Sequence, residues 1–257
     1  NQDKPVLLVK SNLKLGPNVK ITKEINPEEM DPEKESLGLY SAIIVLDGGS
    51  LNMIGSTIET NCNGCNAITV IGDGEANFFD GNIKTLGDNS AGLYACYGGK
   101  ILTDNVDIET HGELSPNLLA KNSGEITASN IDLKSIGPDS PLIYSYGNIM
   151  TSFSDGIAEK SQMVIIEGKS TAILNTGELE GNEGVMIFDK KEQEGTSNFE
   201  SIDSKLELTE KQNPLFLVTN SVASITLIDS EVCGVDENLI NAVSMDPGSN
   251  GAEVTVR

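Results

Sequence analysis

The chain of 257 residues carries 39 acidic and 17 basic side chains, which give it a net charge of −22. Nucleic acid is excluded as an expected partner, because binding to a phosphate backbone requires a basic surface. The sequence has no run of about 18 apolar residues, so we expect no membrane span within it.

The first 36 residues are predicted to form a leading rung, or cap. Two short apolar segments, 6–9 and 19–21, have the composition of short strands. An acidic segment follows at 26–35 and includes Glu28 and Glu29. We expect this charged segment to form a solvated loop.

From about residue 38 onward the sequence repeats itself, with a period of 25 residues up to residue 140. Four ladders of equivalent positions show the repeat: Gly49, Gly74, Gly99 and Gly124; Leu51, Ala76, Ile101 and Ile126; Ile58, Ile83, Ile108 and Leu133; and Ile43, Ile68, Leu93, Leu118 and Ile143. A fixed period in this range is typical of a solenoid, whose repeats stack because none can bury its apolar face alone. The period shortens to about 22 between 141 and 184 and then lengthens.

Each repeat contains three short strands. In 91–115, alternating segments are separated by Gly98-Gly99 and by Asp104-Asn105, without helical periodicity. This pattern predicts an all-β fold, a single-stranded parallel β-helix with rungs of ~25 residues. We expect it to be right-handed, because crossovers between parallel strands are almost always right-handed. The repeats and the leading rung together predict about ten coils in one domain, 1–257. A leucine-rich repeat is excluded because its Leu-x-x-Leu-x-Leu phrase is absent.

Two sets of turn residues are predicted to stack from coil to coil. Glycines suit a tight backbone at one corner, and polar side chains at another corner can bond the backbone of the next coil. The first set is Gly87, Gly112 and Gly137, with Cys62 at the same step, and the second is Asp80, Asn105, Asn130 and Asp155.

Cys62 and Cys65 form a Cys-x-x-Cys pair. A zinc half-site would need a second close pair, and a redox pair would sit at the start of a helix. Cys96 and Cys233 lie in different repeats and supply no such pair. A local disulfide, or two thiols in a turn, is therefore favoured.

No cofactor is expected. The sequence has neither an EF-hand loop nor the Gly-Gly-x-Gly-x-Asp repeat of calcium-binding solenoids. Acidic turns at 72–75 and 137–140 could still hold an adventitious Ca²⁺ ion, and we predict no dedicated metal site.

Several phrases of the repeats are similar to those of a known class of protein. They lie at 92–99, 164–169, 184–188 and 214–220. These phrases resemble the rungs of bacterial secreted or cell-surface parallel β-helix proteins, the adhesin-like or pectate-lyase-like superfold. The resemblance implies an extracellular or cell-surface setting and supplies no catalytic motif.

Five residues form the candidate ligand-binding group. Tyr94 and Tyr144 occupy the same outward-facing repeat position, two coils apart. Tyr146 lies on the same face, at the repeat position that Lys121 occupies in the coil before it. Tyr97 lies at the end of a strand. Aromatic rings on a flat β-surface can stack on sugars, while lysine supplies a directional contact. Alternatively, the rings only cover the sheet and pack on one another.

Two classes of function remain. We favour a non-catalytic, adhesin-like or structural rod whose binding face meets a glycan or a host or cell-surface protein. The alternative is a polysaccharide-active lyase or hydrolase. The only arginine, which a lyase could use as its base, is Arg257 at the end of the sequence. The only histidine, His111, is predicted to lie in a turn. Acid pairs such as Asp107 and Asp132, which a hydrolase would need, are explained as outward polar positions. We therefore assign no catalytic residue, lean against an enzyme and leave the question open.

Overall fold

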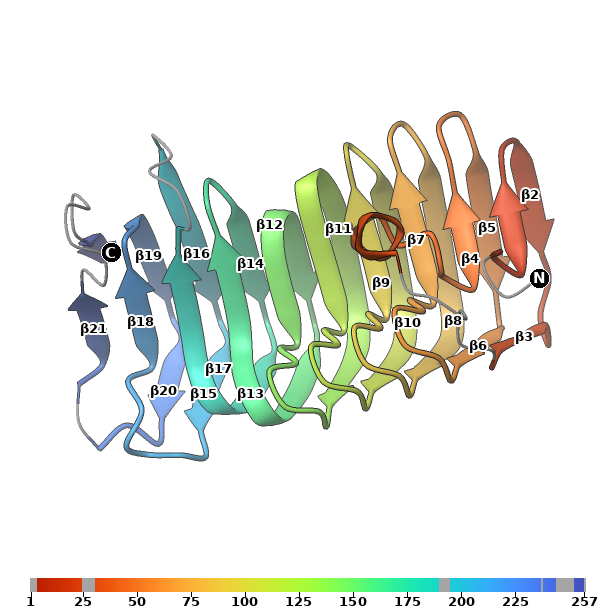
Figure 1. The fold of residues 1–257 in the computed structure, drawn as a ribbon. Helices are drawn as coiled ribbons and strands as arrows, with labels where there is room; N and C mark the ends of the chain where they lie inside the picture. Colours follow the sequence, from red (N-terminus) through yellow and green to blue (C-terminus); the bar gives the residue numbers. More distant parts are fainter. Residues whose placement is uncertain (1–3, 25–30, 190–194, 237, 244–251, 257) are drawn as a thin grey trace.

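The computed structural model describes residues 4–24, 31–189, 195–236, 238–243 and 252–256. These residues form an all-β parallel solenoid, as predicted. The chain winds through stacked coils from the N-terminal end of the rod to the C-terminal end (Figure 1). Each coil contributes strands to three faces, and every strand pair is parallel.

The three faces are numbered in the order in which the chain visits them. Face 1 contains β1 (Leu7–Val9), β4 (Ile43–Val45), β7 (Ile68–Ile71), β9 (Leu93–Cys96), the starts of β11 (Leu118–Ser135) and β12 (Ile143–Ser152), the ends of β13 (Asp155–Glu167) and β15 (Glu178–Phe188), β18 (Phe216–Thr219) and β21 (Ile240–Val243). Face 2 contains β2 (Asn12–Leu15), β5 (Ser50–Ile54), the starts of β8 (Glu75–Thr85) and β10 (Lys100–Thr110), the middle of β11, the end of β12, β14 (Thr171–Asn175), β16 (Thr196–Ile202), β19 (Val222–Ile228) and β22 (Glu253–Val256). Face 3 contains β3 (Lys20–Lys23), β6 (Thr57–Thr60), the ends of β8, β10 and β11, the starts of β13 and β15, β17 (Lys205–Leu208) and β20 (Glu231–Cys233).

The aliphatic ladders form the core of the rod. Ile58 pairs with Ile83, Ile83 with Ile108, and Ile108 with Leu133 on successive coils, and all four side chains are buried. Strand β10 alternates buried and exposed positions on either side of its bend, as a period of two requires. Burying each such side chain stabilises the fold by about 1.5–3 kcal/mol. The predicted stacking is confirmed.

The solenoid has about eight turns, slightly fewer than the ten expected. Strands β1, β2 and β3 at one end, and β21 and β22 at the other, are short, and many of their side chains are half-buried or exposed. The expectation counted these end coils in full, whereas the regular, well-buried stack lies between them.

The corner between faces 3 and 1 requires the glycines that the sequence predicted. A Cβ atom on Gly112 would lie 2.0 Å from the carbonyl oxygen of Gly87, and one on Gly137 would lie 1.8 Å from that of Gly112. A serine ladder reinforces this corner. The hydroxyl of Ser115 accepts from the amide of Ser90 (3.0 Å) and donates to the carbonyl of Gly87 (3.1 Å). Adjacent coils are therefore locked at backbone contact distance.

The polar ladder at the corner between faces 2 and 3 is only partly as expected. Asp80, Asn105 and Asn130 have φ values of 52°, 56° and 48°, in the left-handed region that Asn and Asp tolerate. The side-chain amide of Asn105 donates to the carboxylate of Asp80 (2.7 Å), so side chains bond each other rather than the next backbone.

The placement of Asp155 in that ladder was wrong. Asp155 pairs with Asp132 on face 3, and Phe153, with φ of 50°, occupies the turn position instead. The ladder prediction assumed a 25-residue step, whereas Ser129 pairs with Ser152 at this point because the coil is shorter.

The N-terminal segment adds a helical turn that the sequence did not indicate. Helix α1 (Pro32–Ser36) begins after Asp31, whose side chain accepts from the amide of Glu33. It lies in front of β7 and β9 (Figure 1). The expected acidic loop at 26–35 is thus helical in its second half, while Glu28 and Glu29 lie outside the described residues. No helix in the described part of the chain is long and apolar enough to cross a membrane.

Candidate functional site

The outer surface of face 1 carries a column of mostly apolar side chains above the core. Its members occupy one outward position on successive coils: Ile44, Thr69, Tyr94, Leu119, Tyr144, Ile165, Met186 and Leu217. A sheet that faces water on one side normally alternates apolar and polar residues, so this column distinguishes face 1 from a simple solvent-exposed surface.

Tyr94 lies in this column but is covered. Its side chain is only 2% exposed, and its hydroxyl donates to the carbonyl of Ser36 at the end of α1 (2.7 Å). Burial raises the pKa of the Tyr94 hydroxyl well above its usual value. Tyr94 points outward from its coil as predicted, but helix α1 occupies the space in which a ligand would stack on it.

Lys121 joins the two predicted tyrosines. Its ammonium lies 6.0 Å from the ring centroid of Tyr94 and 5.9 Å from that of Tyr144, which is within the range of cation–π attraction. The hydroxyl of Tyr144 donates to the carboxylate of Glu167. Burial, together with that hydrogen bond, raises the pKa of the Tyr144 hydroxyl. The structure therefore brings Tyr94, Lys121 and Tyr144 into one cluster.

A small cavity of about 200 Å³ opens between α1 and face 1. Glu35 and Ser36 line its helical side, and Tyr94, Leu119 and Lys121 line the side of the sheet. Two members of the tyrosine–lysine cluster, Tyr94 and Lys121, therefore line a cavity beside the helix.

A larger cavity, of about 400 Å³, is a slot at the corner between faces 1 and 2. The slot is lined by Asn122, Ser123, Tyr146, Gly147, Asn148, Lys169 and Ser170. It holds Tyr146, one of the predicted ligand-binding residues.

The slot exists because one coil is shorter than its neighbours. Lys121 pairs with Tyr146 and Glu125 with Asn148, so three corner residues in one coil face the single residue Gly147 in the next. Thr171 of the following coil also pairs with Asn148, and that coil again has a longer corner at 168–170. Two protruding corners therefore flank a recessed floor. They are two strand spacings, or about 10 Å, apart, which is wide enough for one sugar ring.

Glycine and strained backbone shape this corner. A Cβ atom on Gly147 would lie 2.4 Å from the carbonyl oxygen of Gly124, so the floor can sit against its neighbour only with glycine. Asn122 and Ser123 have φ values of 49° and 66°, two consecutive non-glycine residues in the left-handed region. Asn tolerates this conformation, whereas it is uncommon for serine, so the strain at this corner lies at Ser123.

Tyr97 stands beside the wall of the slot. It is 53% exposed, has φ of 54°, and its amide donates to the carbonyl of Lys121 in the next coil (3.3 Å). Of the five predicted ligand-binding residues, Tyr97 and Tyr146 thus lie at the corner, Lys121 and Tyr144 lie on the adjoining face, and Tyr94 is enclosed.

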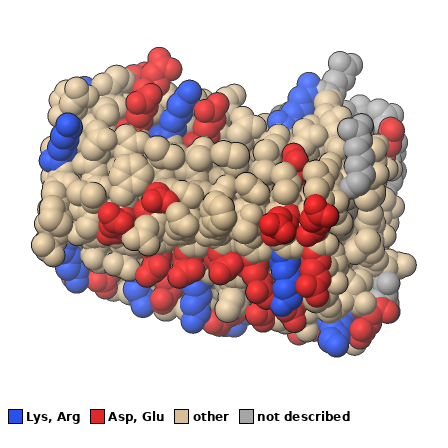
Figure 2. All heavy atoms as spheres, turned by 180° about the vertical axis from the view of Figure 1, so that it is seen from behind, with Lys and Arg blue, Asp and Glu red and all other residues tan. Residues whose placement is uncertain are grey.

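The acidic residues considered for hydrolysis lie elsewhere, on face 3. Asp107 pairs with Asp132, and Asp132 with Asp155, as an exposed column on a flat strand surface. Acidic and basic side chains mix along this edge, which is the lower edge in Figure 2. Among the described residues, the smaller of these two cavities is lined by one carboxylate, Glu35, and the slot by none.

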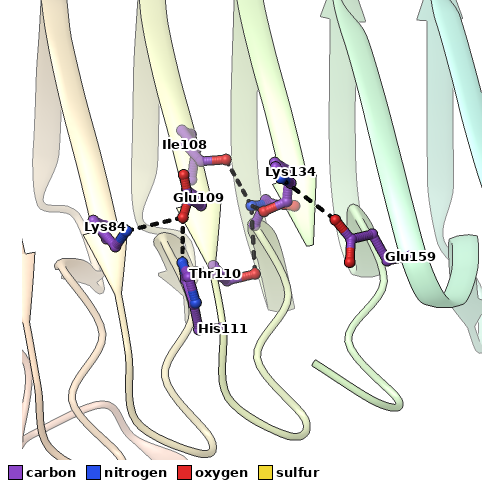
Figure 3. A network of polar contacts seen from close by, with 8 residues as sticks. Lys84, Ile108, Glu109, Thr110, His111, Lys134 and Glu159 are labelled. Carbon is purple, nitrogen blue, oxygen red and sulfur yellow. Dashed lines mark hydrogen bonds and ion pairs between the residues drawn. The ribbon is translucent and has the colours of Figure 1, made fainter. Parts of the chain in front are cut away.

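The single histidine also belongs to face 3. His111 contacts the carboxylate of Glu109, which in turn pairs with Lys84 (3.0 Å), and Lys134 pairs with Glu159 (3.4 Å) close by (Figure 3). The hydrogen bond from Lys84 holds the pKa of the Glu109 carboxyl below its usual value. The two lysine–glutamate pairs link successive coils, whereas His111 contacts a residue of its own coil.

Cys62 and Cys65 are joined by a disulfide, and both pack against the buried Tyr40. Cys96 and Cys233 are free thiols, and burial raises the pKa of Cys96 to about 11. Within the described residues, no group of three or more His, Cys, Asp or Glu side chains is arranged to hold a metal ion.

The fold and the site together define a parallel β-solenoid with a polar, aromatic slot at one corner. Comparisons with known proteins add no closer assignment: no family model, no curated protein and no solved structure matches this chain.

Proposed function

We propose that this protein is a non-catalytic, adhesin-like solenoid that presents the slot and the adjoining part of face 1 to a glycan. The observation that carries the proposal is the slot itself. An aromatic ring, Tyr146, lies among amide, hydroxyl and ammonium groups in a recess of about 400 Å³. Sugar sites combine an aromatic surface with a few convergent polar groups in this way.

The neighbouring aromatics extend this surface. Tyr97 is exposed beside one wall, and Tyr144 lies next to Lys121 on face 1. Tyr144 is held by its hydrogen bond to Glu167 and by Lys121, so its ring has a fixed orientation. A rigid aromatic loses little conformational entropy when a ligand binds, which favours affinity.

An extracellular or cell-surface location, in a bacterial source, belongs to the same proposal. The Cys62–Cys65 disulfide supports it, because disulfides persist in oxidising compartments. The rigid, acidic rod supports it as well, because a high net charge keeps such a body dispersed.

A glycan array combined with an activity screen on plant, host and microbial polysaccharides tests the proposal. We expect binding to at least one glycan class without any cleavage. Cleavage that disappears on substitution of a single carboxylate, for example Asp132→Asn, would replace the proposal with the polysaccharide-active enzyme. An array without any bound glycan would contradict the glycan-binding function directly.

A further inference from the structure

Among the described residues, those that line the slot are rich in hydrogen-bond donors and include no carboxylate, although the chain has 39 acidic residues. The side chains of Asn122, Ser123, Asn148 and Lys169 form no hydrogen bond or ion pair with other parts of the chain that the structure describes. Ser170 differs, because its hydroxyl donates to the carbonyl of Glu167 (2.6 Å). All four residues are exposed, so their donors are available to a ligand that accepts hydrogen bonds.

Two carboxylates on the strands beside the slot are already engaged. Glu125, on the strand beside Asn148, pairs with Lys100 (3.5 Å), and Glu167 accepts from the hydroxyl of Tyr144. Neither lines the slot. Lys100 partly neutralises the charge of Glu125, whereas Glu167 keeps its charge because the hydroxyl of Tyr144 is neutral.

Lys169 is the one cation among the described residues that line the slot, and its aliphatic stem is positioned. A Cβ atom on Gly195 would lie 2.2 Å from Cε of Lys169, which places the aliphatic chain directly over the glycine backbone. The residue is exposed, so its ammonium remains available to solvent and to a ligand. A lysine stem held in this way carries a charge to a fixed place at lower entropic cost.

We propose that the slot binds a sulfate or phosphate ester carried by a sugar ring. The ring would stack on Tyr146, while the ester oxygens would accept from Lys169 and from the amides of Asn122 and Asn148 on the walls and floor. Donors that surround a point from several sides suit a tetrahedral oxyanion. A long polyanion is disfavoured, because its remaining charges would lie along an acidic rod. The inference rests on the proposed glycan-binding function and names its ligand class.

Chemical-shift titrations of the full chain test this inference with matched probes: galactose, galactose 6-sulfate, galactose 6-phosphate and galacturonate, together with inorganic sulfate and phosphate. We expect at least one ester to bind about tenfold tighter than galactose, the size of effect that one charge-assisted hydrogen bond provides. Preference between the two esters identifies the source of the oxyanion.

Lys169→Gln should abolish this preference and Lys169→Arg should retain much of it. Lys10→Gln is the matched control, because Lys10 is an exposed lysine at the equivalent corner of the first coil. The Lys10→Gln variant should prefer the ester over galactose by the same factor as the unchanged protein.

The possible failures are distinguishable. Equal binding of galactose and its esters, or equal binding of galacturonate, would overturn the oxyanion inference and leave glycan binding intact. Binding of inorganic sulfate or phosphate that depends on Lys169, without binding of any sugar, would overturn the glycan function and leave an oxyanion site. An ester preference that survives Lys169→Gln would place the oxyanion outside the slot and contradict the inference.

Discussion

The ammonium of Lys121 lies 5.9 Å from the ring centroid of Tyr144 and also faces the ring of Tyr94. The two tyrosines are two coils apart. Leu119 occupies the coil between the two tyrosines, so the rings do not stack directly. The lysine is therefore the link between the covered and the accessible parts of face 1.

Lys121→Met should lower the free energy of unfolding by about 1 kcal/mol, since it removes cation–π attraction but keeps an apolar stem over the sheet. Urea unfolding measures the change. Lys10→Met, at an exposed lysine of the first coil, should leave the unfolding free energy within about 0.5 kcal/mol of its original value. An equal effect of the two substitutions would show that the ring contacts contribute nothing specific.

Gly112→Ala should destabilise the rod by more than about 2 kcal/mol, because the added Cβ would meet a backbone carbonyl that cannot move independently. That contact, with Gly87, is 2.0 Å. Gly16→Ala is the matched control: a Cβ there meets nothing within 4 Å, and its φ is not in the left-handed region. Thermal unfolding of both variants checks the prediction, and a harmless Gly112→Ala would mean that the coils are further apart at this corner.

Alkaline pH should destabilise the protein through Tyr94 and Tyr144. Burial raises the pKa of both hydroxyls in the folded state. The unfolded chain loses these protons near pH 10, so the full stability is present below about pH 10 and falls as pH rises further. The slope is up to about 1.4 kcal/mol per pH unit for each tyrosine.

The double variant Tyr94→Phe with Tyr144→Phe should flatten this decline. Denaturant unfolding at a series of alkaline pH values provides the comparison. A decline as steep as that of the unchanged protein would assign the alkaline sensitivity to other groups.

The sequence predicted the fold well wherever the repeat is regular. Ile58, Ile83, Ile108 and Leu133 are spaced by 25 residues, and one equivalent position per coil is what parallel pairing without bulges produces. The same spacing predicted that Lys121 and Tyr146 occupy equivalent positions on successive coils, and they pair in the structure. It failed for Asp155, since the coil that precedes it is shorter.

Two features of the site could not be predicted. Helix α1 covers Tyr94, but its residues belong to no repeat and nothing in their spacing indicates where they pack. The slot has a signal in the sequence, the shorter period after residue 141. Only the pairing shows that the shorter coil lacks residues at one corner, where it has Gly147 alone, and that longer corners flank Gly147 on both sides.

The most direct test of the account is isothermal titration of the glycan that the array selects, with Tyr146→Ala and with Phe153→Ala. Phe153 is the control because its ring is 61% exposed at the corner between faces 2 and 3, away from the slot. The account predicts that Tyr146→Ala weakens binding at least about tenfold, since an aromatic contact with a ligand is worth about 1–3 kcal/mol, while Phe153→Ala leaves affinity unchanged. Unchanged affinity of the Tyr146→Ala protein would contradict the claim that the slot is the binding site.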